Sequence, residues 1–282
     1  MKGIIFAGCS FTWGQGLYYY HGLDTLREPP EDQYIGQYVR DAHLNYMKSI
    51  RFPRLVANYF NTFEVVKLQN GGCEDESIKF LDYIFDEDNT IHDYLTREKY
   101  TYNEIEYIVL QTSQPIRNTF SFTLNDEVFS MNLGGCTDRE IKSFHEWLDL
   151  NETTYDEWYQ EFMDQCFQKL KMELQFYESK GIKTKIICWQ PDYITRIMGN
   201  LFTRSKLIEL NYNSKSYTNI AEMMRDNKEL EIKHDHRNFT ETPKDHHPSK
   251  LCHQVIAENI IEHIETNDKI WQRQNIPPIK IL

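Results

Sequence analysis

Residues 3–16, with the sequence GIIFAGCSFTWGQG, form the stretch that decides the fold. The apolar run Gly3–Ala7 predicts a short buried strand, because small and branched apolar side chains follow one another without a polar break. The residues from Gly8 to Gly16 then predict a glycine-rich turn.

Outward from this stretch, three more apolar runs predict buried strands, at Glu64–Leu68, Ile105–Gln111 and Lys185–Trp189. Helical patterns lie between and after them, at Pro53–Phe60, Ser77–Phe85, Thr154–Gly181 and Lys250–Ile264. Strands that alternate with helices indicate a parallel sheet covered on both faces. The sequence therefore predicts an α/β fold, a three-layer α/β/α sandwich with a central, mostly parallel sheet.

No linker or internal repeat interrupts the pattern, which predicts a single domain over residues 1–268. Residues 18–36 predict a loop or lid, and its Tyr18–Tyr20 run either lines a carbohydrate-binding cleft or packs under the lid. A lid or insertion is expected around 118–150, with a small hairpin around Asn125-Asp126. Residues 269–282 predict an extended tail that docks on its own domain or on a partner.

Composition excludes several classes of protein. The 282 residues are 40% hydrophobic, enough for a core, and no run reaches the ~20 apolar residues of a membrane-spanning helix. The net charge of −12 disfavours nucleic acid as a partner, because phosphates require a basic surface. Six scattered cysteines without a CxxC pair indicate reduced thiols rather than disulfides or a zinc ribbon. The run before Cys9 is too short for a signal peptide, which predicts synthesis in the cytoplasm.

Polar clusters follow three of the predicted strands, at Cys9-Ser10, Asn70–Ser77 and Gln111–Ser113. In α/β sheets the active groups collect at the carboxyl ends of the strands. A fourth cluster, Asp245–Ser249 with the sequence DHHPS, stands just before the last predicted helix. A serine on a tight turn after a strand, together with a later aspartate and histidine, supplies the parts of a nucleophilic hydrolase.

Two of these clusters carry a resemblance to a known family. Gly8–Gly14 resembles the first block of the SGNH (GDSL-like) hydrolases, Gly-Asp-Ser-x-Ser/Thr-x-Gly, and Asp245–Ser249 resembles their last block. The resemblance, which is to phage-encoded members above all, implies a flavodoxin-like SGNH hydrolase fold and a serine hydrolase with no cofactor and no metal. It implies cleavage of a small ester through an acyl-enzyme on Ser10, as in an esterase or a deacetylase of acylated carbohydrate.

The resemblance also implies roles for individual residues. The catalytic triad would be Ser10, Asp245 and His247, with His246 as the alternative base, since the acid and the base are spaced Asp-x-His rather than Asp-x-x-His. The oxyanion would be held by the backbone N–H groups of Ser10 and Asp75 and by the hydroxyl of Ser113.

Three positions depart from the family pattern. Cys9 replaces an aspartate that braces the loop, Asp75 stands at the glycine position of the second block, and Ser113 replaces the asparagine of the third block. The departures at Asp75 and Ser113 favour the alternative of a non-catalytic structural or binding protein, such as a virion component, that retains the fold, whereas the change at Cys9 leaves the chemistry possible. Cys9 itself is expected to be a small buried thiol.

A histidine-rich stretch near the C-terminus offers a metal site as another interpretation. It comprises His234, His236, His246, His247 and His253. No cysteine partner and no HExxH motif accompanies these histidines, which favours solvated loop side chains over metal ligands.

Overall fold

The computed structural model describes residues 2–9, 12, 17, 41–66, 73–85, 99–133, 135–200, 204–232 and 245–268, without the side chains of residues 41–44, 245 and 246. Ser10, the predicted lid at 18–36 and the predicted tail at 269–282 lie outside these residues. No helix in the described ranges is long and apolar enough to cross a membrane.

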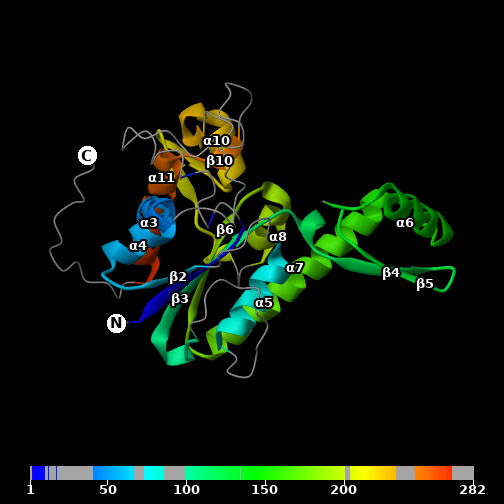
Figure 1. Cartoon of the computed structure of the whole chain (residues 1–282), viewed down its shortest axis with the longest axis horizontal. Coiled ribbons are helices and arrows are strands. Elements are labelled where there is room, and N and C mark those ends of the chain that lie inside the picture. The colour runs from blue at the N-terminus through cyan, green and yellow to red at the C-terminus, as the bar shows by residue number, and fades with distance from the viewer. Residues whose placement is uncertain are drawn as a thin grey trace.

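A four-stranded parallel sheet forms the centre of the molecule (Figure 1). Its strands are β1 (Gly3–Ala7), β2 (Glu64–Val66), β3 (Ile105–Thr112) and β6 (Lys183–Cys188), in the order β2-β1-β3-β6. The chain therefore leaves β1 toward one edge and returns to β3 on its other side. This is the order of the first four strands of a flavodoxin-like sheet, whose ligands bind where the order reverses, here between the carboxyl ends of β1 and β3.

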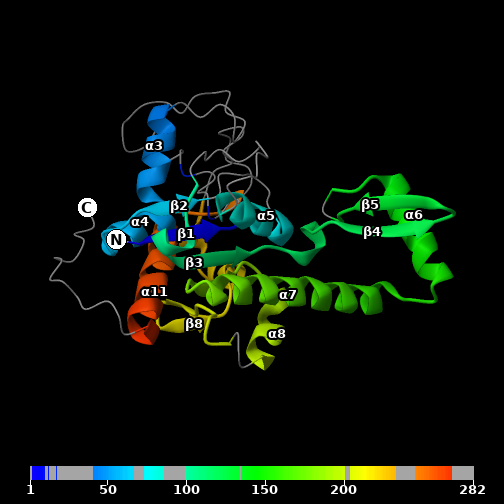
Figure 2. The same cartoon turned by 90° about the horizontal axis from the view of Figure 1, so that it is seen from below.

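Helices cover both faces of this sheet (Figure 2). The α-helices that the structure describes, apart from one in the insertion, are α3 (Asp41–Ile50), α4 (Phe52–Tyr59), α5 (Glu74–Phe85), α7 (Tyr155–Ser179), α8 (Ile194–Gly199), α10 (Ile220–Asp226) and α11 (Lys250–Asp268). Short 3-10 turns lie at Tyr102–Glu104, Pro115–Arg117, Pro191–Tyr193 and Lys228–Leu230.

The side chains of the strands alternate between the two faces. From β1, Ile4 and Phe6 pack with α4, α10 and α11, whereas Ile5 and Ala7 pack with α5 on the opposite face. From β6, Ile186 and Cys188 pack with α7 and α8. Every residue of β1 is buried, as expected for a central parallel strand. The predicted three-layer α/β/α sandwich around a mostly parallel sheet is confirmed.

The insertion after β3 forms an arm that stands away from the sheet in both views (Figures 1 and 2). It contains the hairpin of β4 (Phe120–Leu124) and β5 (Glu127–Met131), the helix α6 (Asp138–Leu150) and the first half of α7. The hairpin turn is at Asn125-Asp126, as predicted, and both residues have positive φ angles, 51° and 64°. Asn and Asp tolerate this left-handed conformation, which suits a two-residue hairpin turn.

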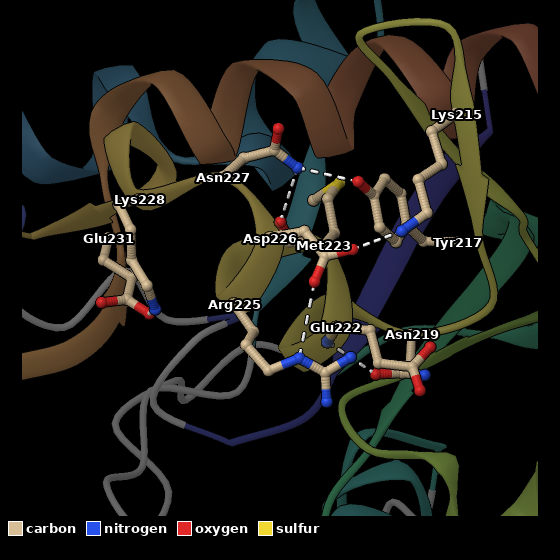
Figure 3. Close-up of polar contacts among 10 residues, drawn as sticks. All are labelled: Lys215, Tyr217, Asn219, Glu222, Met223, Arg225, Asp226, Asn227, Lys228 and Glu231. Carbon is tan, nitrogen blue, oxygen red and sulfur yellow. Dashed lines mark hydrogen bonds and ion pairs between the residues drawn. The ribbon is translucent and has the colours of Figure 1, made fainter.

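The segment after α8 supports the last polar cluster. It comprises the hairpin of β7 (Leu210–Tyr212) and β8 (Lys215–Tyr217), then α10, then β9 (Glu231–Ile232), which pairs antiparallel with β10 (Asp245–Pro248). Figure 3 shows how β8 is tied to α10: Lys215 pairs with Asp226, and Asn227 Nδ2 donates to the Tyr217 hydroxyl at 3.0 Å. The Asn219 side chain caps α10 by accepting the Glu222 N–H at 2.9 Å.

Several element boundaries differ from the expectations. The helix predicted from Ser77 begins three residues earlier, at Glu74, because three acids in its first turn interact favourably with the positive end of the helix dipole. The strand predicted at Lys185–Trp189 runs from Lys183 to Cys188, and the last helix continues to Asp268. Asp245–Pro248, expected only as a cluster before that helix, is a short strand.

Candidate functional site

The carboxyl ends of β1 and β3 are joined by a buried polar network. Thr12 Oγ1 donates to Gln111 Oε1 at 2.6 Å, and Gln111 Nε2 donates to Cys9 Sγ at 3.2 Å. All three residues are at most 2% exposed. Gln111, near the end of β3, therefore bonds to Cys9 and Thr12, which stand on either side of Ser10 in the sequence. Ser10 itself lies outside the described residues.

Gly8 is required by this close packing. A Cβ atom at Gly8 would lie 2.2 Å from Thr12 Oγ1 and 2.9 Å from Gln111 Cβ, closer than side chains tolerate. The buried Cys9 thiol is confirmed as a small core residue, and it accepts a hydrogen bond where the resemblance places an aspartate. Gln111 thus bridges Cys9 and Thr12 without that aspartate.

A second polar group lies where α5 begins beside the end of β3. The Ser113 N–H donates to Glu74 Oε1 at 2.5 Å, and the Asp75 N–H donates to Asn118 Oδ1 at 3.3 Å. The Asp75 carboxylate also pairs with Lys169 at 2.5 Å. Two of the predicted oxyanion residues, Asp75 and Ser113, are therefore brought together around Glu74.

The hydrogen bonds around Glu74 determine which polar atoms remain free to contact a ligand. The Asp75 N–H already has Asn118 Oδ1 as an acceptor, although the bond is long. The Ser113 hydroxyl and Glu74 Oε2 are buried and have no hydrogen-bond partner among the described residues. An unsatisfied buried polar atom is costly, which makes these two atoms candidates for contact with a ligand.

Burial raises the pKa of Glu74, because its carboxyl is 3% exposed and loses the water that stabilises the charged form. The Ser113 N–H and the Asn118 amide act in the opposite direction, and the neighbouring Asp75 adds to the increase. Glu74 stood within the second block but was not predicted as a site residue. Its position directly after the strand and turn was a usable signal, whereas nothing in the local sequence marked Asn118.

The last block is anchored to the segment that follows α8. The Ser249 N–H donates to the Leu230 carbonyl at 2.7 Å, and Ser249 Oγ accepts the Cys252 N–H at 3.2 Å, which caps α11. The side chains of Asp245 and His246 lie outside the described part, whereas His247 is half-buried.

The start of α11 can be placed relative to β1 through buried rings. His253, in the first turn of α11, stacks its ring on Phe52 at 5.6 Å, and the Phe52 ring lies 5.8 Å from the Phe6 ring. Phe6 is the penultimate residue of β1. The start of α11, which follows the last block in the chain, therefore lies near the carboxyl end of β1.

His253 is not a solvated loop histidine, so that expectation is wrong for this residue. It is fully buried in α11, and its Nδ1 accepts the Phe52 N–H at 3.2 Å. Burial, together with Arg51 and His247, lowers the pKa of His253 to about 3, so it is neutral at physiological pH. Within the described ranges, no three His, Cys, Asp or Glu side chains are grouped so that they could hold a metal ion.

No protein-family model matches the chain, and neither a curated protein nor a solved structure matches it significantly.

Proposed function

We propose that the chain is a serine hydrolase of the SGNH type that cleaves a small ester, with acylated carbohydrate as the substrate class. One observation carries the proposal: Cys9 and Thr12, which flank Ser10 in the sequence, follow β1 where the strand order reverses, and the start of α11, which follows the last block, lies near the same end of β1. That arrangement supports a reaction in which Ser10 and His247 take part.

In the proposed reaction, His247 takes the proton of the Ser10 hydroxyl as Ser10 Oγ attacks the ester carbonyl. Asp245 orients the imidazole and stabilises its charged form. The alkoxide leaves with the proton that His247 gives back. Water, activated by the same histidine, then hydrolyses the acyl-enzyme and restores Ser10. The chemistry requires no cofactor.

The oxyanion would be held by the backbone N–H of Ser10, the Ser113 hydroxyl and the Asp75 N–H. The Ser113 hydroxyl is buried and lacks a partner in the described residues, which supports its role as a donor. The Asp75 N–H would exchange its long bond to Asn118 Oδ1 for the oxyanion. Loss of one such donor typically lowers kcat by about 10²–10³-fold.

Glu74 favours the second candidate function, a non-catalytic structural or binding protein with this fold, for example in a virion. An ionised carboxylate whose Oε1 accepts the Ser113 N–H at 2.5 Å would repel an oxyanion formed there. Protonation of Glu74 would remove this objection, because a neutral carboxyl does not repel the anion, and burial shifts the pKa of Glu74 in that direction.

Turnover of short acyl esters, including acetylated sugars, tests the proposal. Ser10→Ala and His247→Ala should each abolish turnover in a folded protein, and Ser113→Ala should lower kcat. Ser121→Ala and His145→Ala are the matched controls, because both residues are exposed in the arm. Turnover equal to wild type in Ser10→Ala or His247→Ala would reject the hydrolase, and no turnover in the wild-type protein would favour the second candidate.

A further inference from the structure

The arm, defined as residues 118–164, is a structural unit with its own core. Eight buried side chains form this core: Phe122, Leu124, Phe129, Met131, Phe144, Leu148, Trp158 and Phe162. None of them belongs to the three clusters that pack on the sheet. Among the partly buried hydrophobic residues that the structure describes, Cys166 alone packs against both this core and one of those clusters. The Trp158 ring lies 4.7 Å from the rings of both Phe120 and Phe144. This aromatic core holds a surface away from the sheet (Figures 1 and 2).

The arm carries most of the net charge of the protein. Its 47 residues contain eleven acidic and two basic side chains, a net charge of −9, whereas the whole chain has −12. Arg139 pairs with Glu127 at 2.8 Å, and Arg196 pairs with Asp164 at 2.5 Å. Six exposed acids of the arm have no ion pair within the described residues: Asp126, Asp138, Glu146, Asp149, Glu152 and Asp156. The arm therefore has a strongly negative surface.

Exposed apolar side chains lie among these acids at the turn between α6 and α7. Leu150 is 66% exposed and Tyr155 is 41% exposed, on either side of this turn. The unpaired acids Asp149, Glu152 and Asp156 lie in the same eight residues. We call residues 149–156 the turn surface. Apolar side chains with charged neighbours are a common composition of protein–protein interfaces.

We propose that the turn surface docks a protein partner that presents basic side chains around an apolar recess. Charge complementarity selects this class of partner, because opposite charges speed encounter and like charges exclude wrong partners. The same negative surface repels nucleic acids and anionic membranes. It also disfavours a second copy of this chain docking through the same surface, since the two negative turn surfaces would face each other.

A displayed library of random short peptides, panned against the full chain at low salt, tests this assignment. The enriched peptides should be net positive and contain a large apolar residue. One of them, made synthetically, should bind the wild-type chain more weakly as salt increases, because screening weakens contacts between exposed charges. Leu150→Ser should weaken binding about tenfold, as expected for an exposed apolar side chain that the partner would cover.

Matched variants keep the test specific. Met172→Ser removes a side chain of similar exposure, 68%, from α7 beyond the arm, and it should leave binding unchanged. The triple variant Asp149→Asn, Glu152→Gln, Asp156→Asn should lose most of the peptide binding. A second triple variant, Glu209→Gln, Glu258→Gln, Glu262→Gln, removes the same amount of charge outside the arm and should still bind the peptide.

Three results would overturn the assignment. These are enriched peptides that are neutral or acidic, peptides that bind the turn-surface variants as well as the wild-type chain, and a stable dimer of the purified chain that Leu150→Ser dissociates. Circular dichroism of each variant distinguishes loss of binding from loss of folding, and a variant that fails to fold is replaced by Leu150→Ala or by the single charge changes.

Discussion

Replacing Gly8 with alanine is expected to destabilise the protein strongly. The added Cβ would lie 2.2 Å from Thr12 Oγ1 and 2.9 Å from Gln111 Cβ, so the loop or the strand must move. Overpacking of this kind costs about 1–3 kcal/mol. Moving Thr12 would also break its 2.6 Å hydrogen bond to Gln111 and leave a buried oxygen unpaired, which costs about 1–3 kcal/mol more. The free energy of unfolding should therefore fall by about 2–6 kcal/mol.

Urea denaturation of Gly8→Ala, with the slope compared with wild type, measures this loss. Gly199→Ala is the control, because nothing lies within 4 Å of a Cβ at that position. In a Thr12→Ala background the cost of Gly8→Ala should be smaller, since the closest atom is gone. If Gly8→Ala matches Gly199→Ala, or if its cost is the same in both backgrounds, the close packing of loop and strand is refuted.

Three further predictions concern buried side chains outside this contact. Burial raises the pKa of Glu74 above that of the unfolded chain, so its carboxyl stabilises the fold most below the unfolded-state pKa of 4.5 and loses this contribution as pH rises through the raised value. The stability of wild type relative to Glu74→Gln should therefore fall as pH rises above 4.5, and a constant difference would contradict this prediction. The pKa of His253 is lowered to about 3, so the neutral ring stabilises the fold above the unfolded-state pKa of about 6.5, and this contribution is lost as pH falls toward 3. In urea denaturation, the free energy of unfolding of His253→Gln should fall less between pH 6.5 and pH 4 than that of wild type, and an equal fall in both would refute the assignment. Trp158→Ala should cost about 3–5 kcal/mol within the arm, because the ring contacts Phe120 and Phe144; hydrogen exchange should accelerate there while β1 and β3 stay protected, and uniform loss of protection would show that the arm is not a separate unit.

The parts of the fold that sequence predicts are those with a local signal. Gly3–Ala7 is apolar throughout, and the strand lies at those residues. Thr154 and Glu157 form the capping box that begins α7. By contrast, α6 was missed although Thr137 and Glu140 form the same motif, because its buried face consists of only two residues, Phe144 and Leu148.

The polar network of the candidate site depends on long-range contacts, which no local pattern encodes. Thr12 and Gln111 are 99 residues apart in the chain, and Glu74 meets Ser113 across 39 residues. Sequence could place a serine after the first strand and polar residues after β3. It could not show that the buried Glu74 of the second block meets Ser113 of the third, because that contact follows from the order of the strands.

The central claim is that Ser10 is an activated nucleophile, and labelling with a fluorophosphonate probe tests it most directly. Such a probe traps an activated serine whatever its natural ester. The wild-type chain should be labelled at Ser10, with Ser10→Ala unlabelled and His247→Ala labelled far more slowly. Absence of labelling in a well-folded wild-type protein, or equal labelling of Ser10→Ala, would contradict the proposed hydrolase activity. A structural or binding role would then be the better account of this protein.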